Sequence, residues 1–344
     1  MPDRFIALLD LDCFYCQCEQ VRLGIDGSTT PVAVFQWGGA IAVNYPARKL
    51  NIKRFARFEE MREVAPDLVG IHVEVDKLSI VHPMAAAGGD RDDEDDEDAR
   101  EIKYEAQYNL TEEERRAALA RENGYFPDRA GGKANIERYR YVSGKIFQEM
   151  RLFLNERLEG SKYLLEKASI DELYLDLTDY VERQVASSIA PKALEGKVVT
   201  IQPPPPSLQR QPQEIDERTF LCASLVSELR QRIKSVLGYT MSAGVGPNKS
   251  MAKLAASSAK PDGVAILPRD VDCVSHALKT TAAVDVRGYA GKFGEKLCTA
   301  VLKHRGWEGP WEGEEFKAAK KVRLKFHLQI SASDNTNEHN RRRP

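Results

Sequence analysis

The chain has 344 residues, and its 50 Lys and Arg against 52 Asp and Glu give a formal net charge of −2. At about 150 residues per domain, this length predicts two or three domains with their own cores. The apolar runs, such as residues 5–9, are far shorter than the roughly 20 residues of a membrane span, and no secretory leader follows Met1. We therefore expect an intracellular protein without membrane contact.

The near-zero net charge hides an uneven distribution. Residues 90–98 hold eight acids and one Arg, so the rest of the chain is mildly basic. Between Gly238 and Arg305, ten Lys and Arg stand against five Asp and Glu. Such a segment suits a polyanion such as nucleic acid, although a solvated surface explains the charge equally well.

The first predicted elements are short and apolar. Residues 4–9 form a run of strand type that ends just before Asp10. Residues 31–35 and 40–43 bracket Gly38-Gly39, which predicts a hairpin or two strands around a tight turn. The segment between residues 9 and 31 contains three closely spaced cysteines, Cys13, Cys16 and Cys18. We interpret them as buried thiols on a helix, because no second Cys or His cluster completes a zinc site.

The second half alternates helices and strands. Apolar residues at helical spacing between Asn135, a candidate cap, and Gly160 predict a core helix. Residues 163–168 and 172–177 predict paired strands. The further predicted elements are a helix over 222–236 closed by Gly238, a strand at 240–245 and a helix over 248–258.

Two segments interrupt this alternation. Residues 84–132 contain the acidic run and then a helix, which starts at the capping box of Thr111 and Glu114 and stops at Asn123-Gly124. Residues 202–213 are rich in Pro and Gln and predict an exposed loop. The order of elements predicts an α+β fold with a split βαβ, ferredoxin-like sheet rather than a doubly wound parallel sheet.

Two groups of carboxylates stand at predicted strand ends. Asp10 and Asp12 follow the first strand, and on their own they are more often caps of the next helix than metal ligands. Asp171 and Glu172 stand at a corner between two strands, where they serve one site only if the backbone bends there. Taken together, carboxylates on neighbouring strand ends repel one another unless hard cations such as Mg²⁺ lie between them.

Two ions so placed suit phosphoryl or nucleotidyl transfer, because one activates the attacking hydroxyl and the other neutralises the leaving phosphate. A nucleoside triphosphate also needs cations, for which Arg48, Arg54 and Lys249 are candidates. Residues 244–250 lack the glycine that a phosphate-binding loop has before its lysine, so we do not predict a Walker site.

Six blocks of sequence, in order, resemble the Y-family of translesion DNA polymerases, and most closely its eta branch. They cover residues 4–83 and 131–305. The blocks are Leu9-Asp-Leu-Asp-Cys-Phe-Tyr15, residues 33–39 (AVFQWGG), residues 41–48 (IAVNYPAR), Gly132-Lys-Ala-Asn135, Ala168-Ser-Ile-Asp-Glu172 and residues 242–255 (SAGVGPNKSMAKLA).

This resemblance implies an architecture of palm, fingers and thumb. It places the palm at residues 1–15 and 133–257, small fingers at 16–83, an acidic and helical insertion at 84–132, a helical thumb at 258–306 with a helix-hairpin-helix element, and a divergent tail at 307–344.

The resemblance also implies site residues. Asp10, Asp171, Glu172 and the carbonyl of Leu11 match the ligands of two Mg²⁺ ions. Tyr15 matches the steric gate that excludes the ribose 2′-hydroxyl. The other matches are Tyr45, Arg48 and Lys249 for the triphosphate of a dNTP, Gln36 and Arg54 for the base pair, and Gly291, Lys292 and Gly294 for a DNA phosphate.

We expect primer-template DNA and dNTP as partners, and a nuclear location. The resemblance stops after about Gly306, so the little-finger domain and the segment that binds a sliding clamp are not seen, and we interpret the chain as truncated. Two alternatives stay open: a palm-type nucleotidyl cyclase, and a weak or inactive fragment that binds DNA or partners.

Overall fold

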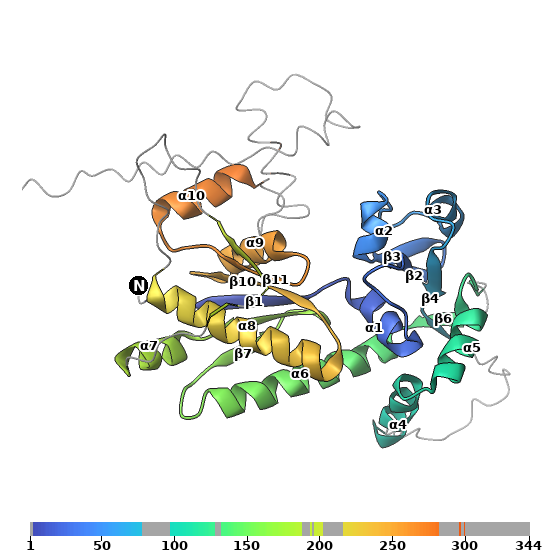
Figure 1. The fold of residues 1–344 in the computed structure, drawn as a ribbon, viewed down its shortest axis with the longest axis horizontal. Coiled ribbons are helices and arrows are strands. Elements are labelled where there is room, and N and C mark those ends of the chain that lie inside the picture. Colours follow the sequence, from blue (N-terminus) through green and yellow to red (C-terminus); the bar gives the residue numbers. More distant parts are fainter. Residues whose placement is uncertain are drawn as a thin grey trace, which may run out of the picture. The chain divides into compact units, whose positions relative to one another are not determined.

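The computed structural model describes residues 3–77, 97–127, 132–187, 193–194, 196–201, 216–281, 296 and 299 (Figure 1). The chain divides into two compact units, one of Met1–Val199 with Asp216–Ile266 and one of Thr200–Ile215 with Leu267–Pro344. In the second unit the structure describes helix α10 (Val271–Thr280), which Asp270 caps by accepting from two backbone N–H groups. None of the described helices has the length and apolar character to span a bilayer.

A six-stranded mixed sheet forms the centre of the first unit. Strand β1 (Ile6–Leu11) runs antiparallel to both of its neighbours, β8 (Glu172–Asp176) and β10 (Met241–Gly246). Strand β11 (Gly263–Ile266) pairs parallel to β10, beyond the palm boundary predicted at residue 257. With β7 (Leu164–Lys167) and β9 (Lys197–Thr200) at the two edges, the strand order is β7-β8-β1-β10-β11-β9, and the predicted α+β class is confirmed.

Both faces of this sheet are covered, so β1 is buried along its whole length. On one face, Ile6 and Leu8 of β1 pack with Ala252 and Ala256 of helix α9 (Lys249–Ala259). The helix lies against the strand because β10 has Gly244 there. A Cβ on Gly244 would come within 2.1 Å of the Ala252 carbonyl oxygen, so no larger residue fits without moving α9.

Helices α6 (Glu137–Arg157) and α8 (Glu217–Leu237) pack on each other and cover the other face (Figure 1). The helical stripe predicted from residue 222 is confirmed, and α8 ends at Gly238 with φ 77°, the left-handed conformation that favours glycine. Helix α6 begins after Ile136, and Asn135 still accepts a hydrogen bond from the N–H of Glu137. Helix α7 (Thr178–Ala186) packs against α8.

A smaller sheet follows helix α1 (Phe14–Leu23) in the chain. Strands β2 (Val32–Gln36) and β3 (Gly39–Val43) form the predicted hairpin, and β4 (Val69–His72) pairs parallel to β2. The short helices α2 (Tyr45–Lys49) and α3 (Phe58–Val64) contribute Ala47 and Met61 to the core beneath this sheet.

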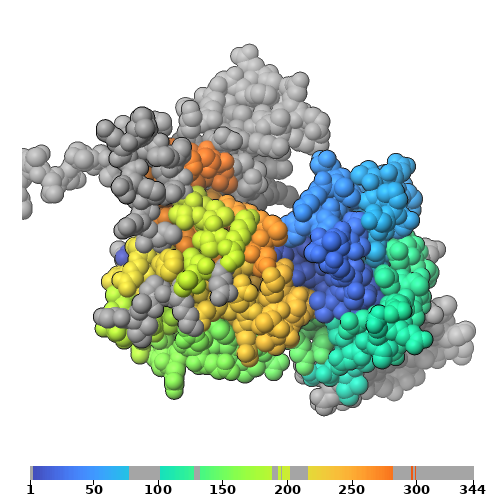
Figure 2. All heavy atoms as spheres, viewed as in Figure 1, coloured from blue at the N-terminus to red at the C-terminus, as the bar shows by residue number. Residues whose placement is uncertain are grey.

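The insertion is helical in its described part. Helix α4 (Glu97–Tyr108) was not predicted, whereas α5 (Glu112–Glu122) begins at the predicted capping box of Thr111 and Glu114. Strand β5 (Glu74–Lys77), before the insertion, pairs antiparallel with β6 (Gly132–Asn135), after it. The described helices α4 and α5 of the insertion lie directly against α1 (Figure 2). Most of the acidic run lies outside the described residues.

Candidate active site

Two of the predicted carboxylates face each other across the central sheet. Asp10 of β1 and Glu172 of β8 are direct partners in the antiparallel register. Directly opposed residues have their Cβ atoms about 4.5–5.5 Å apart on the same face. This is the face of Leu8 and α9, and the Asp10 residue is only 8% exposed.

The third carboxylate, Asp171, stands at the corner before β8. Ser169 holds the bend, because its hydroxyl accepts the backbone N–H groups of Asp171 and Glu172 at 3.2 and 3.0 Å and donates to the Asp171 carboxylate at 2.5 Å. The N–H of Leu11 donates to the Asp171 carbonyl at 2.9 Å, which fixes the corner beside β1. The backbone therefore bends between the two acidic residues, as a shared site requires.

Lysines from α9 and its C-terminal end neutralise these carboxylates. Lys260 Nζ lies 2.7 Å from Asp10 Oδ2, and Lys253 Nζ lies 2.7 Å from both oxygens of Glu172. Burial raises the pKa of Asp10 to about 6; Lys260 opposes this rise, whereas the negative charges of Glu172 and Asp171 add to it. Glu172 and Asp171 thus lie close enough to Asp10 to act on it electrostatically.

The donor chemistry of this group fits a hard cation such as Mg²⁺. Carboxylate oxygens are its preferred protein ligands, and the raised pKa of Asp10 reflects first its burial and only then the negative charges of Glu172 and Asp171. In the described part of the chain, no three His, Cys, Asp or Glu side chains converge closely enough to hold a metal ion. The Lys260 ammonium contacts one oxygen of the Asp10 carboxylate, Oδ2.

Tyr15, on the first turn of α1, is half-buried. Its ring meets that of Tyr139 edge-on, with centroids 4.4 Å apart and planes at 67°. Burial and the charge of Asp171 raise the pKa of Tyr15, while Arg140 and Arg54 oppose the rise. The phenol of Tyr15 is therefore close enough to Asp171 to feel its charge, and the ring of Tyr139 packs beside it.

Asp12 is neither a helix cap nor a member of the acidic group. It is 1% exposed, and Cys13, in a left-handed conformation, precedes α1 without a side-chain cap. Its carboxylate accepts hydrogen bonds from Tyr45 Oη at 2.8 Å, Ser242 Oγ at 2.7 Å and the N–H of Asp262 at 2.8 Å. Asp12 thus joins β1, β10, α2 and the turn before β11.

The two predicted cationic triphosphate contacts, Arg48 and Lys249, have different surroundings. Arg48 is exposed, with its guanidinium 5.0 Å from the ring centre of Tyr45 and its Nε donating to the Val43 carbonyl at 2.8 Å. Lys249 begins α9 as predicted, but its ammonium pairs with Glu166 of β7 instead of the acidic group.

Lys260, the cation that contacts Asp10, was missed in the sequence. It lies just beyond α9, before Pro261-Asp262-Gly263, a run with the residues typical of a tight turn. Because β11 begins at Gly263, this turn returns the chain to the sheet close to Asp10. The turn signal could have placed Lys260 at the edge of the sheet; its pairing with Asp10 depends on contacts distant in sequence.

The predicted base-pair residues belong to the small sheet and the loop after it. Gln36 ends β2, and the next residue, Trp37, has φ 56° and donates its N–H to His72 Nε2 at 2.8 Å. Arg54 is exposed, with its guanidinium 5.2 Å from the ring centre of Phe55.

The structure describes the predicted cysteine cluster but not the predicted DNA-phosphate residues. Cys16 and Cys18 of α1 are fully buried and form no disulfide, as predicted, and burial raises the pKa of both thiols well above the usual range. The same prediction was wrong for Cys13, which is only partly buried and precedes the helix. The predicted DNA-phosphate residues Gly291, Lys292 and Gly294 lie outside the described residues, as does the tail from residue 307.

Comparisons with known proteins agree with the motifs. The model of the impB/mucB/samB family matches residues 9–257. The chain is 30% identical over 318 residues to N-acetyltransferase eso1 of Schizosaccharomyces pombe, covering 86% of this chain and 31% of the relative. It is 26% identical over 342 residues to DNA polymerase eta of Drosophila melanogaster, covering 88% and 31%, and 28% identical over 274 residues to that of Saccharomyces cerevisiae, covering 77% and 42%.

The chain thus spans about a third of the length of the first two of these relatives. It also resembles the solved insertion ternary complex of Dbh DNA polymerase, with a TM-score of 0.49 and 18% identity over 88% of this chain and 58% of that one. The family match covers most of the chain and includes all three acids of the group at β1 and β8. The chain belongs to the impB/mucB/samB family, which confirms the resemblance to Y-family polymerases that its motifs predicted.

Proposed function

We propose that this chain carries the catalytic centre of a template-directed DNA polymerase that adds a dNTP to a primer 3′-hydroxyl opposite damaged template bases. The observation that supports this most is the register of β1 and β8. It sets Asp10 against Glu172, with Asp171 at the corner beside them and Lys260 on Asp10. Family membership and the relatives named DNA polymerase eta support the same activity.

In this proposal Asp10, Asp171, Glu172 and the Leu11 carbonyl hold two Mg²⁺ ions. When bound, such ions activate the primer hydroxyl and neutralise the leaving pyrophosphate. Once displaced from Asp10, Lys260 is free to bind phosphate oxygens of the incoming nucleotide.

The remaining residues act on the substrate. Arg48 is exposed beside Tyr45, so its planar guanidinium is available to a triphosphate. Tyr15 excludes a ribose 2′-hydroxyl by volume. Gln36 and Arg54 contact the base pair, beside the exposed hairpin turn, where a Cβ on Gly38 would meet no atom within 4 Å. Small residues at this turn would leave room for an enlarged template base.

Primer-template DNA is the partner that this chemistry requires. The relatives named DNA polymerase eta come from eukaryotes, which supports a nuclear location for this chain. The basic segment from Gly238 to Arg305 would attract the DNA backbone, so we expect synthesis to weaken strongly with added salt.

Primer extension with Mg²⁺ and dNTP tests the proposal. The wild-type chain is compared with Asp171→Ala, Glu172→Ala and the control Glu156→Ala, which removes an exposed carboxylate from α6. We expect extension by the wild type and the control and its loss in the two site variants. Equal extension by all four refutes the assignment of the acids. Consumption of triphosphate without DNA would instead indicate a nucleotidyl cyclase.

A further inference from the structure

A buried polar network surrounds Glu19 of α1, outside the acidic group. The Glu19 side chain has no exposed surface, and its carboxylate accepts from Arg22 Nε at 2.8 Å, Arg138 Nη1 at 3.1 Å and Tyr139 Oη at 2.8 Å. Burial alone would raise the pKa of Glu19, but Arg138 and Arg22 outweigh it, so the pKa is lowered and the carboxylate stays charged. Two guanidinium groups therefore lie around one buried carboxylate.

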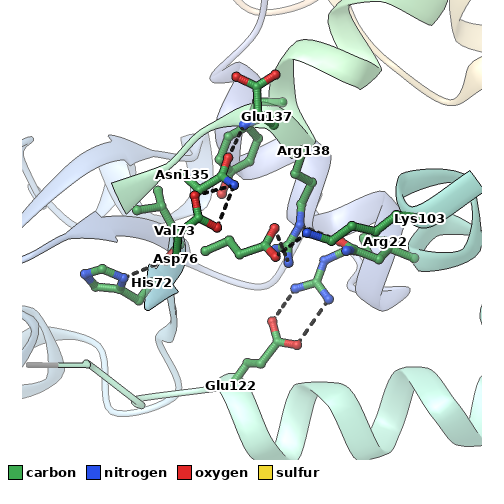
Figure 3. A network of polar contacts seen from close by, with 12 residues as sticks. Arg22, His72, Val73, Asp76, Lys103, Glu122, Asn135, Glu137 and Arg138 are labelled. Atoms are coloured by element: carbon green, nitrogen blue, oxygen red, sulfur yellow. Dashed lines mark hydrogen bonds and ion pairs between the residues drawn. The ribbon is translucent and has the colours of Figure 1, made fainter. Parts of the chain in front are cut away.

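The inserted helices supply the remaining partners (Figure 3). Arg22 donates to both oxygens of Glu122, the last residue of α5, with Nη1 at 3.2 Å from Oε1. Arg138 donates from Nε to Gln107 of α4 at 2.8 Å and forms a longer ion pair, at 4.0 Å, with Glu74. The Arg22 side chain is 3% exposed and pairs with both Glu19 and Glu122. The insertion thus supplies the second of the two carboxylates around this buried guanidinium.

The other end of the network reaches Tyr15. Tyr139 is 1% exposed, and its hydroxyl is fixed by Glu19, so its ring has a defined position. That ring lies edge-on to Tyr15, and an edge-to-face contact depends on the relative tilt and distance of the two rings. Tyr15 and Glu19 are also four residues apart on α1, which places both on one side of the helix.

We propose that helix α5 of the insertion positions the gate residue: Glu122 holds Arg22, Arg22 and Arg138 hold Glu19, and Glu19 holds Tyr139 against Tyr15. Selection of deoxyribose over ribose then depends on Glu122, a residue of the insertion that does not touch the substrate. This inference rests on the proposed polymerase function and adds a positioning role to a segment that the family motifs do not include. Glu122 and Tyr139 are positioning residues, and Tyr15 is the group that meets the sugar.

The test measures sugar discrimination by the full chain, as the ratio of kcat/KM for a dNTP to that for the matching NTP in single-nucleotide primer extension. Glu122→Gln keeps the size of the side chain and removes its charge, and Tyr139→Phe keeps the ring and removes the hydroxyl. We expect each variant to lower the ratio about threefold to tenfold, tenfold corresponding to about 1.4 kcal/mol. Tyr15→Ala gives the upper limit of the loss.

The matched control is Glu112→Gln at the other end of α5, where the side chain is 80% exposed and pairs with Arg116. It should leave the ratio unchanged. A merely structural role of the network would lower dNTP and NTP efficiency together, so an unchanged ratio in folded Glu122→Gln and Tyr139→Phe overturns the inference. If Glu122→Gln does not fold, Tyr139→Phe alone decides. A wild type that extends no primer overturns the proposed function and this inference with it, whereas discrimination unaltered in the variants overturns only the inference.

Discussion

The role of Asp12 can be tested through stability. The carboxylate is buried and accepts three hydrogen bonds, from Tyr45, Ser242 and the N–H of Asp262. In Asp12→Asn one oxygen remains for Tyr45 and Ser242, but the amide NH₂ replaces the oxygen that accepts from Asp262, so two donors face each other. Hydrogen bonds to charged groups contribute about 1.5–3 kcal/mol each, so we expect the free energy of unfolding to fall by about 2 kcal/mol.

A loss of this size lowers the Tm of a unit of this length by about 4–8 °C. Thermal and urea unfolding, followed by circular dichroism, measure it, and Asp12→Ala should lose more because all three donors lose their acceptor. The control is Asp67→Asn, at an exposed position before β4, which should leave Tm unchanged. If Asp12→Asn is as stable as the wild type, the hydrogen bonds of Asp12 do not stabilise the fold as its contacts indicate.

Two further predictions concern the lysines and the Glu19 network. Lys260→Ala should raise the KM for dNTP at least about tenfold in steady-state extension and Lys249→Ala much less, because Lys260 contacts Asp10 whereas Lys249 pairs with Glu166, outside the acidic group; equal effects would contradict this. Glu19→Gln should lower the free energy of unfolding at pH 7 by about 3–5 kcal/mol, since it removes the buried carboxylate that Arg22 and Arg138 share and leaves Arg138 with only the longer ion pair to Glu74. Because the folded-state pKa of Glu19 is lowered, its stabilisation is complete above the unfolded value of about 4.3 and is lost as the pH falls through the folded pKa. The stability gap between wild type and variant should therefore narrow only below about pH 4, and narrowing that begins well above pH 5 would refute the assignment.

Much of the fold could be predicted from local signals. Helical spacing and caps identified α5, α6, α8 and α9, because the apolar face of a helix and the residues at its ends are properties of short segments. Helix α4 was missed, since its first residues belong to the acidic run and its own Gln107 and Tyr104 contact α6, which is distant in sequence. The strand that begins at Glu172 was predicted with its correct start, whereas β1 runs two residues beyond the predicted end at Leu9, so Asp10 lies within the strand and does not follow it; its pairing with β8 and β10 extends the strand past the apolar run.

By itself, then, the sequence determined the element types, the family and the acids of the candidate site. Only the tertiary structure decided which charges meet. The antiparallel register of β1 and β8 opposes Asp10 to Glu172, and the turn before β11 brings Lys260, not Lys249, to Asp10. Pairing of this kind depends on how strands and helices far apart in the chain pack, since side chains interact over a few ångströms whatever their separation in sequence. For the same reason, only the packing of α5 on α1 connected Glu122 through Arg22 and Glu19 to the ring beside Tyr15.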